Sequence, residues 1–463
     1  MTDIKNATTK RAMIALIFSL AWPTMLEQLM QTAVQYVDLA MVGSLGTDAA
    51  ATVGSTTTVN WLLGSTISAL GVGFLSIIAK AIGASDKPLV KRASAQTVFI
   101  TLVAGTIFTL IPLVLSPVVP TLMNVEPHLR KSSALYFFIL YTPMLFRTAS
   151  VIFGTALRAS GDTKTPMRVG VLVNIVNIVL NFFMIYKTRT VKIFSAEMKM
   201  FGFGWGVTGA AIASAIAFAV GGILIAVSLF RHPLLSPRGE SIKPDMTVLR
   251  PCLKVALPNM LQRFCTSFGY VCFASMINSL GEVATAAHTF ANTVESAFYI
   301  PGYGMQTAVA TLAGNAYGAK DNAKMKQMTS LIIKIEVLLM IVSGGLLFAF
   351  APNLMSIFSD NPDVIRLGGT VLRMVALSEP FYGVSIIIEG MLLGVGRTVT
   401  PFKFNVIGMW GVRILGTFIV TVFLSQGLEA AWGCMIAHNL LIFVLYVIHY
   451  KKGKWNPLET KNA

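Results

Sequence analysis

Residues 206–230, GVTGAAIASAIAFAVGGILIAVSLF, contain no charged side chain and no proline. As an α-helix this stretch would be about 37 Å long at roughly 1.5 Å per residue, enough to cross a bilayer core of roughly 30 Å. Similar apolar stretches occupy 93–115 and 335–351. The 463-residue chain is 55% hydrophobic and 12% charged, with a mean hydropathy of +0.71. A soluble core cannot bury that much apolar surface, so the sequence predicts an all-α membrane protein.

About twelve transmembrane helices are expected from the apolar stretches. The stretches are too long and continuous for barrel strands, which alternate apolar and polar residues. The first follows Lys10 and Arg11 as in a signal peptide, but it runs on without a cleavage site, so we expect it to stay in the protein. The expected spans lie near residues 12–43, 50–80, 93–116, 132–155, 167–186, 205–230, 248–279, 284–314, 327–351, 364–394, 401–424 and 428–449.

The net charge of +16 is placed as in a bacterial inner-membrane protein. Most of the 36 Lys and Arg residues fall in the N-terminus, in loops after even-numbered spans and in the C-terminal tail. By the positive-inside rule these regions, including both termini, are cytoplasmic, and a nucleic-acid patch is not indicated. The loop 187–204 is an exception, because it is basic and lies outside; its mixed basic and apolar residues suit a segment at the membrane surface.

The second half of the chain repeats the first at an offset of 235 residues. Pro23 falls on Pro258, and GDTKTP at 161–166 falls on GRTVTP at 396–401. Six spans per repeat bring both repeats into the membrane from the same side, so the repeats are parallel. Two such lobes are typical of alternating-access transporters. The expected division is an N-terminal lobe at 1–230, a cytoplasmic linker at 231–250 and a C-terminal lobe at 251–463.

Polar side chains inside the first and fifth spans form the candidate ion-coupling site. Asp38 ends a first-span stripe that also contains the helical-spacing residues Gln31 and Gln35. Ionisable groups in spans are costly and are functional candidates by default. A carboxylate suits proton exchange in a medium of low dielectric constant, and amide oxygens around it would equally suit Na⁺. The fifth-span amides expected to join Asp38 are Asn174, Asn177 and Asn181.

The open alternative for these residues is a structural hydrogen-bond network between helices. The repeat does not preserve them: the position of Asp38 is taken by Phe273, and those of the three asparagines by Met409, Val412 and Gly416. Coupling is therefore expected in the N-terminal lobe only.

The C-terminal lobe carries the candidate substrate-binding residues. Glu295 and Tyr299 share one face of the eighth span, where a carboxylate beside aromatic rings could receive a cation. Alternatively, Glu295 pairs with Arg263 or Arg413. The tenth span adds Tyr382 and Glu389, and the first-span Gln31 and Gln35 complete the candidate set.

Prolines within spans are candidate hinges, because they interrupt the backbone hydrogen-bond ladder. The expected hinges are Pro23, Pro258 and Pro301. The four cysteines show no CxxC spacing, so neither a disulfide framework nor a metal site is indicated, apart from a possible Na⁺ at Asp38.

Six motifs occur in order along the chain. They are Gln31-Thr32-x-x-x-Tyr36-Val37-Asp38-x-x-Met41-x-Gly43, Leu157-Arg158-Ala159-x-Gly161-Asp162-Thr163, Asn174-x-x-Asn177-x-x-x-Asn181, Ala286-Ala287-His288, Ile300-Pro301-x-x-x-x-x-Thr307-Ala308 and Gly394-x-Gly396-x-Thr398. Together they resemble the motifs of the multidrug and toxic compound extrusion (MATE) family, particularly its NorM-like bacterial members, and the resemblance covers nearly the whole chain.

The resemblance implies a twelve-span, two-lobe exporter of cationic or amphipathic molecules that exchanges them for Na⁺ or H⁺. It also implies that Asp38, Asn177 and Asn181 carry the coupling site. The chain departs from the NorM-like pattern where acidic residues are expected, with Gln262 and Thr266 in the seventh span and Tyr382 in the tenth.

We therefore expect a secondary antiporter, monomeric in the bilayer, without a cofactor other than its coupling ion. A flippase for a lipid-linked sugar is the alternative, although its cavity should be basic and the charges within these spans lean acidic. A membrane-embedded enzyme is less favoured, because the chain has no HExxH motif and no Cys/His pair, and no Walker A motif indicates ATP hydrolysis.

Overall fold

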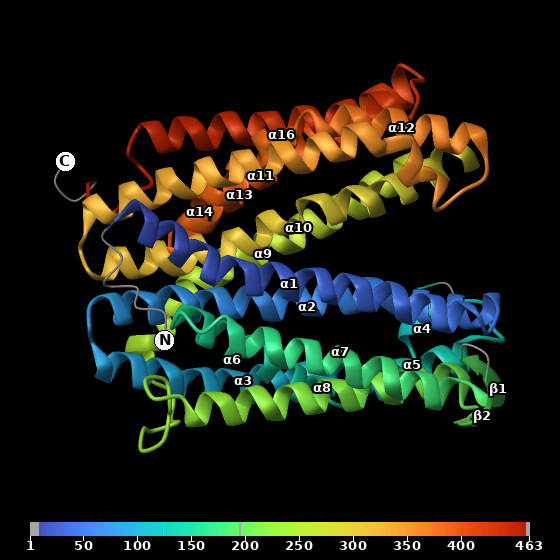
Figure 1. The fold of residues 1–463 in the computed structure, drawn as a ribbon, viewed down its shortest axis with the longest axis horizontal. Coiled ribbons are helices and arrows are strands. Elements are labelled where there is room, and N and C mark those ends of the chain that lie inside the picture. The colour runs from blue at the N-terminus through green and yellow to red at the C-terminus, as the bar shows by residue number, and fades with distance from the viewer. Residues whose placement is uncertain (1–8, 124, 194–195, 460–463) are drawn as a thin grey trace. The chain divides into compact units, whose positions relative to one another are not determined.

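The computed structural model describes residues 9–123, 125–193 and 196–459. Sixteen α-helices, two π-helical stretches and a β-hairpin occur in this part of the chain (Figure 1). Their ends lie within a few residues of most expected span boundaries, so the prediction of an all-α membrane protein is confirmed.

The first half of the chain contains eight helices and two strands. They are α1 (Lys10–Gly43), α2 (Thr47–Gly83), α3 (Lys87–Leu115), the single turn α4 (Val119–Leu122), α5 (Arg130–Tyr141), α6 (Met144–Ala159), α7 (Lys164–Ile185), β1 (Lys187–Ile193), β2 (Ala196–Phe203) and α8 (Gly206–Arg231).

The second half contains the remaining helices, two of them short π-helical stretches. They are α9 (Met246–Asn278), α10 (Glu282–Gly318), α11 (Asn322–Ser356), α12 (Pro362–Ala376), α13 (Glu379–Gly394), α14 (Val399–Val406), η1 (Ile407–Ile414), α15 (Leu415–Phe418), η2 (Ile419–Phe423) and α16 (Leu428–Lys451).

Length and composition allow eight of these described helical segments to cross a membrane, or up to ten if each bent helix pair is one span. The bent pairs are α5 with α6 and α12 with α13. Helices α9 and α10 are also long, with 33 and 37 residues, but they do not reach the same apolar content. Their polar residues include several of the candidate site residues.

Aspartate side chains cap the N-terminal turns of two of the long helices. Asp321 accepts a hydrogen bond from the backbone N–H of Lys324 at 2.9 Å at the start of α11. Asp162 accepts from the backbone N–H of Thr165 at 3.0 Å at the start of α7. Each bond satisfies an N–H that the helix itself leaves unpaired.

The two sharp bends lie next to prolines. The axes of α5 and α6 meet at 45° beside Pro143, and those of α12 and α13 meet at 54° beside Pro380. Proline lacks a backbone N–H, so a helix can break there without losing a further hydrogen bond. Helices α1, α9 and α10 instead continue through the expected hinges Pro23, Pro258 and Pro301.

The chain forms two compact units. Unit 2 consists of Leu29–Phe74 and Lys87–Leu249. Unit 1 consists of the segment ending at Gln28, of Leu75–Asp86, and of the chain from Arg250 onward. Unit 2 is therefore not identical to the expected lobe 1–230, because the first part of α1 and the last part of α2 belong to unit 1.

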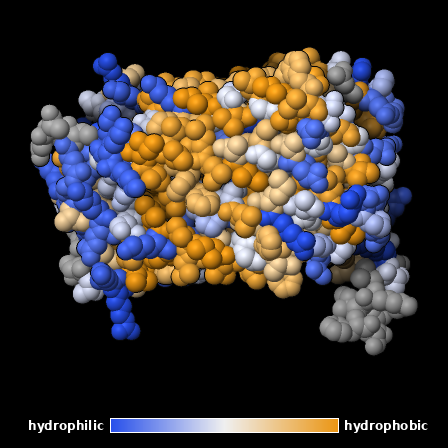
Figure 2. All heavy atoms as spheres, turned by 90° about the horizontal axis from the view of Figure 1, so that it is seen from above, coloured by the Kyte–Doolittle hydropathy of each residue, from blue (hydrophilic) through white to orange (hydrophobic). Residues whose placement is uncertain are grey.

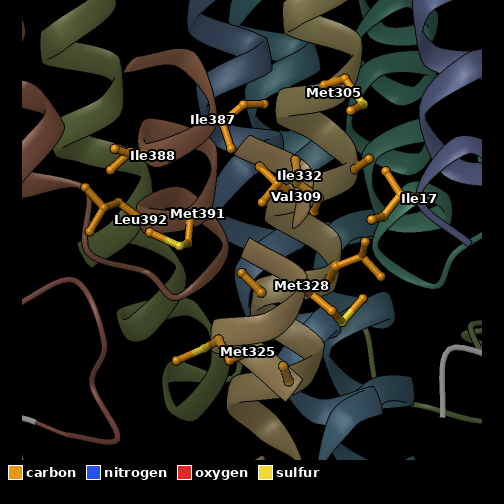
Figure 3. Close-up of a cluster of buried hydrophobic side chains, with 14 of the residues drawn as sticks. Ile17, Met305, Val309, Met325, Met328, Ile332, Ile387, Ile388, Met391 and Leu392 are labelled. Carbon is orange, nitrogen blue, oxygen red and sulfur yellow. The ribbon is translucent and has the colours of Figure 1, made fainter. Parts of the chain in front are cut away.

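Apolar packing explains why the start of α1 belongs to unit 1. Ile17 of α1 is fully buried in a cluster with Val309 of α10, Ile332 of α11 and Ile387 of α13 (Figure 3). In the same unit, Thr24 donates through Oγ1 to the carbonyl oxygen of Gly304 at 2.9 Å. Within a bilayer, such van der Waals packing and interhelical hydrogen bonds hold helices together.

Close approach of α10 and α13 depends on a glycine. A Cβ atom added at Gly394 would lie 2.1 Å from the carbonyl oxygen of Ala310. Only glycine permits that spacing, as at many helix contacts in membranes.

Hydrophobic residues gather along the middle of the face shown in Figure 2, and hydrophilic residues gather toward its ends. This distribution suits helices whose middle parts face lipid and whose ends face water.

The basic loop 187–204 is an antiparallel β-hairpin in its described residues, a structure that the sequence analysis did not predict. Phe201 and Phe203 lie on its second strand, Trp205 directly precedes α8, and all three side chains are exposed. Adjacent rings lie 5.0 Å and 4.7 Å apart between centroids.

The linker is held to α3 rather than extended in solvent. Gln96 donates through Nε2 to the carbonyl oxygen of Lys243 at 2.8 Å, and its Oε1 accepts from the backbone N–H of Asp245 at 3.1 Å. Hydrogen bonds from Thr247 lower the pKa of the Asp245 carboxyl.

Candidate functional site

Unit 2 brings Asp38 together with the fifth-span asparagines. Asn181 on α7 donates through Nδ2 to Asp38 Oδ1 on α1 at 2.6 Å. Residues 177 and 181 are four apart, so both lie on the face of α7 that carries this contact. Asn177 and Asn181 are buried and Asp38 is half-buried. A charged carboxylate is therefore solvated here by protein amides.

Asn177 links the carboxylate to a further helix. Its amide lies 2.8 Å from Asp38 Oδ1 and 3.1 Å from the Oγ of Ser214 on α8. With its nitrogen turned toward the carboxylate, Asn177 donates to Asp38 and accepts from Ser214, and the hydrogen-bond network is the basis for choosing an amide orientation. The site thus joins α1, α7 and α8.

Two further residues of unit 2 border this site. Tyr136 on α5 is buried and lies within electrostatic range of Asp38. Asn174 is buried one turn before Asn177, and among the described residues its Nδ2 has no hydrogen-bond partner. Sequence reasoning missed Tyr136 and Ser214, because an isolated hydroxyl in an apolar span gives no spacing pattern; the burial of polar groups in spans is the signal that could have drawn attention to them.

Gln31 and Gln35 are exposed on α1. They share the helical stripe with Asp38, but within the described residues the hydrogen bonds of Asn177 and Asn181 go to Asp38, to Ser214 and to each other, not to these glutamines. The candidate ion-coupling residues therefore cluster, and these two candidate substrate residues stand apart from them.

Unit 1 gathers three tyrosines from α10 and α13. The hydroxyls of Tyr303 and Tyr382 lie 3.0 Å apart. The ring centroid of Tyr299 lies 5.7 Å from that of Tyr303 and 6.1 Å from that of Tyr382, both in edge-to-face arrangements. Of the candidate substrate residues, Tyr299 and Tyr382 are thus brought together, and Tyr303 extends the pair.

Glu295 lies one turn before Tyr299 and is 6% exposed. It is within electrostatic range of Arg413 on η1. The Arg413 guanidinium carbon lies 4.8 Å from the ring centroid of Tyr270 and 4.2 Å from that of Phe273 on α9. Arg413 thus combines cation–π contacts with attraction to Glu295.

Glu389 lies apart from Glu295 and is held by amides. Gln262 on α9 donates through Nε2 to Glu389 Oε1 at 2.8 Å. Asn405 on α14 also hydrogen-bonds Glu389 and contacts the hydroxyl of Tyr446 at 3.2 Å. The amide that replaces an expected acid in the seventh span is therefore the partner of the tenth-span acid.

In this arrangement Asn177 and Asn181 turn their amide nitrogens toward Asp38, so the carboxylate oxygens are the groups that could accept a proton. Binding of Na⁺ would in addition require amide oxygens to turn toward the ion, because hard cations take oxygen ligands. Within the described residues, no group of three or more His, Cys, Asp or Glu side chains could hold a metal ion, and the four cysteines are free.

Comparisons with known proteins agree with this architecture. The MatE family model matches residues 23–183 and 258–419, one match in each repeat. Over 450 residues the chain is 28% identical to a probable multidrug resistance protein NorM of Thermotoga maritima, covering 95% of this chain and 92% of that one. It is 26% identical to the probable multidrug resistance protein YoeA of Bacillus subtilis, covering 93% and 92%.

Solved structures share the fold. A MATE in the bent conformation matches with a TM-score of 0.87 at 22% identity, covering 97% of each chain. The outward-facing conformation of a multidrug resistance MATE family transporter matches with a TM-score of 0.87 at 22% identity, covering 96% of each chain. With its two family matches, its duplicated helical fold and its NorM relatives, the chain belongs to the MatE family and is a NorM-like membrane transporter.

Proposed function

We propose that this protein is a secondary antiporter that exports cationic or amphipathic small organic molecules in exchange for H⁺ or Na⁺. In this proposal it works in the bacterial inner membrane by exposing its substrate site alternately to the two sides. The names of its relatives, which are probable multidrug resistance proteins, support the substrate class. The observation that carries the coupling is the Asp38 carboxylate held by Asn177 and Asn181.

A carboxylate held in this way can couple to an ion because its charge changes the stability of the surrounding contacts. When ionised, Asp38 accepts hydrogen bonds from the two amides, and these contacts join α1 to α7. When a proton or Na⁺ neutralises it, the charge-assisted bonds weaken. The ion therefore favours one arrangement of the helices over the other by its difference in affinity, which is the requirement for coupling.

The tyrosine cluster of unit 1 is the proposed place for the organic cation. The faces of Tyr299, Tyr303 and Tyr382 can attract a cation, and Glu295 supplies a nearby negative charge. A site of this kind tolerates differently shaped cations, because π faces and one carboxylate impose little directionality.

The test is efflux of ethidium from loaded vesicles under an imposed Na⁺ or H⁺ gradient. Asp38→Asn keeps the size of the side chain but removes its charge, so we expect gradient-driven efflux to be lost while the protein stays folded. Asp48→Asn is the matched control, because Asp48 is an exposed aspartate on α2. The gradient that drives wild-type efflux identifies the ion.

Unchanged efflux in Asp38→Asn would assign Asp38 a structural role only. Absence of wild-type efflux for a set of organic cations under both gradients would overturn the drug-antiport proposal and favour lipid-linked sugar flipping.

A further inference from the structure

A second acidic site lies in unit 1, built on a helix that the tyrosine–cation proposal does not use. Its central residue is Glu336, the only acidic residue of α11. Glu336 is 0% exposed, and among the described residues neither of its carboxyl oxygens has a hydrogen-bond partner. An ionised carboxylate in this position would have neither water nor donors, and the cost of such burial far exceeds that of a neutral acid.

The space occupied by Glu336 is provided by two glycines. A Cβ atom at Gly302 of α10 would lie 2.7 Å from Glu336 Oε1, and one at Gly383 of α13 would lie 3.2 Å from the same oxygen. The carboxyl group is thus directed into the contact between α10 and α13. Met340 and Ile386 also border Gly302, so apolar atoms surround the acid.

Glu379 is the second carboxyl of this site. It is the first residue of α13, directly after the 54° bend from α12. It is 1% exposed, and its Oε2 has no partner among the described residues. A Cβ atom at Gly344 of α11 would lie 3.4 Å from the Glu379 Cβ, so this side chain packs against the helix that carries Glu336.

The acids of this site repel one another. Glu379 lies within electrostatic range of both Glu295 and Glu336. Arg413 is the nearby cation, and it faces Glu295. Like charges in a shared low-dielectric site cannot all be ionised, so at least one carboxyl must hold a proton or a cation. The titratable group that interacts with Glu336 is Glu379 on α13, which in turn interacts with Glu295 on α10.

We propose that Glu336 and Glu379 form a second proton-binding site, in which the bend between α12 and α13 places a releasable proton on Glu336. The surroundings favour a proton over Na⁺, because a bound Na⁺ needs several oxygen ligands and Glu336 faces Met340, Ile386 and glycine backbone. On release, the O–H bond of the Glu336 carboxyl breaks and the proton passes to water that reaches the bend; on binding, the same bond forms again. No other group is oxidised or reduced.

This inference does not depend on the coupling role of Asp38. The readout below detects a protonated carboxyl in the purified protein, without a substrate or a gradient. A negative ethidium experiment would therefore not contradict the proposal for Glu336. Likewise, a negative result in the experiment below would not contradict the proposed role of Asp38.

The experiment is infrared spectroscopy of the purified full-length protein in lipid, titrated from acidic to alkaline pH. The carbonyl stretch of a protonated carboxylic acid distinguishes it from a carboxylate. We expect a protonated-acid band in the wild type that disappears as the pH rises. Glu336→Gln should remove this band, whereas Glu429→Gln, at an exposed glutamate of the same unit, and Asp38→Asn should retain it.

Three results would overturn the inference. The first is an unchanged band in Glu336→Gln, which would place the proton elsewhere. The second is a band that persists at every pH at which the protein is folded, which would make Glu336 a permanently neutral structural acid. The third is loss of the band on adding NaCl, but not choline chloride, at constant pH, which would assign the site to Na⁺.

A second variant covers the case in which Glu336→Gln fails to fold. Glu336→Asp keeps the acid but withdraws it from the glycine contacts, so we expect the band to remain with a changed frequency and a shifted pH midpoint. An Asp variant with the wild-type frequency and midpoint would contradict the proposed position of the proton.

Discussion

Helix α7 and its repeat in the second half of the chain start from the same sequence motif and differ in what they carry. Helix α7 is a regular α-helix whose buried face holds Asn174, Asn177 and Asn181. In its repeat, two π-helical stretches interrupt the helix, and the position of Asn174 is the buried Met409. The repeat of Asp38 is Phe273, which is 1% exposed and packs beneath Arg413.

The comparison shows that duplication preserved the scaffold and not the site. In unit 2 the acid lies on α1 and is surrounded by donors. In unit 1 the acids lie on α10, α11 and α13, and Glu336 has no donor in the described structure. Asp38 of unit 2 and Glu336 of unit 1 are therefore held in opposite ways: amides solvate Asp38, whereas Glu336 is left to be neutralised.

The largest expected effect on stability is that of replacing Arg413 in unit 1. Arg413→Met removes the positive charge near Glu295 and leaves a buried acid uncompensated, so we expect the free energy of unfolding to fall by roughly 3–5 kcal/mol. The measurement is unfolding in mixed detergent micelles.

The matched control is the buried arginine of unit 2. Arg147 is hydrogen-bonded to Asn60 and its guanidinium carbon lies 4.8 Å from the ring centroid of Phe218. Arg147→Met should cost less, about 2 kcal/mol. Adding Glu295→Gln to Arg413→Met should restore part of the loss; no restoration would show that Arg413 acts by packing alone.

Replacing each unit's acid by an apolar residue should change stability in opposite directions. Asp38→Leu leaves the amides of Asn177 and Asn181 without their acceptor and should destabilise the protein by about 1–3 kcal/mol. Glu336→Met replaces an unpartnered acid by a side chain of similar size and should stabilise it by about 1–3 kcal/mol. The measurement is the melting temperature of both variants. Shifts of the same sign would contradict the proposed difference between Asp38 and Glu336.

Much of the architecture could be predicted from the sequence, because apolar length and charge placement act locally. The spans, the repeat and the pairing of Asp38 with Asn181 depend on helical spacing that can be counted along the chain. The membership of the first part of α1 in unit 1 could not be predicted, since it depends on which apolar side chains pack against Ile17. Apolar contacts are not directional, so the sequence does not show which apolar surfaces pair with each other.

The spatial arrangement of the acidic residues of unit 1 could not be predicted from the sequence either. Glu336 is the one acidic residue of α11, and only the packing of the helices shows that Gly302 and Gly383 border it.

The positions of the sharp bends could not be predicted either. They lie beside Pro143 and Pro380, whereas helices continue through Pro23, Pro258 and Pro301. A proline removes one hydrogen bond wherever it stands, and the neighbouring helices decide whether the axis breaks.

A smaller effect is expected at Glu389, the acid of unit 1 that resembles Asp38 in being held by an amide. Gln262→Met removes one donor while Asn405 remains, so the free energy of unfolding should fall by about 1 kcal/mol. The control is Gln426→Met, at an exposed glutamine of the same unit, which should change it little. A loss in Gln262→Met as small as in the control would mean that Glu389 is stabilised without this hydrogen bond.

The smallest expected effect is a pH dependence from the end of α8 in unit 2. His232 Nδ1 accepts from the backbone N–H groups of Leu234 and Leu235 at 3.2 Å and 3.1 Å, and burial lowers the pKa of this imidazole. The folded state therefore favours the neutral ring, whereas the unfolded chain takes up a proton near the ordinary value of about 6.5.

The stabilising contribution of His232 is thus complete above about pH 6.5 and is lost as the pH falls toward the lowered pKa of the folded state. Protonation also places hydrogen on Nδ1 and ends its role as an acceptor, which loosens the turn that begins the linker. We expect the melting temperature of the wild type to fall more between neutral and mildly acidic pH than that of His232→Gln. The exposed His128 supplies the control, since His128→Gln should retain the wild-type slope; equal slopes in all three proteins would remove His232 as the titrating group.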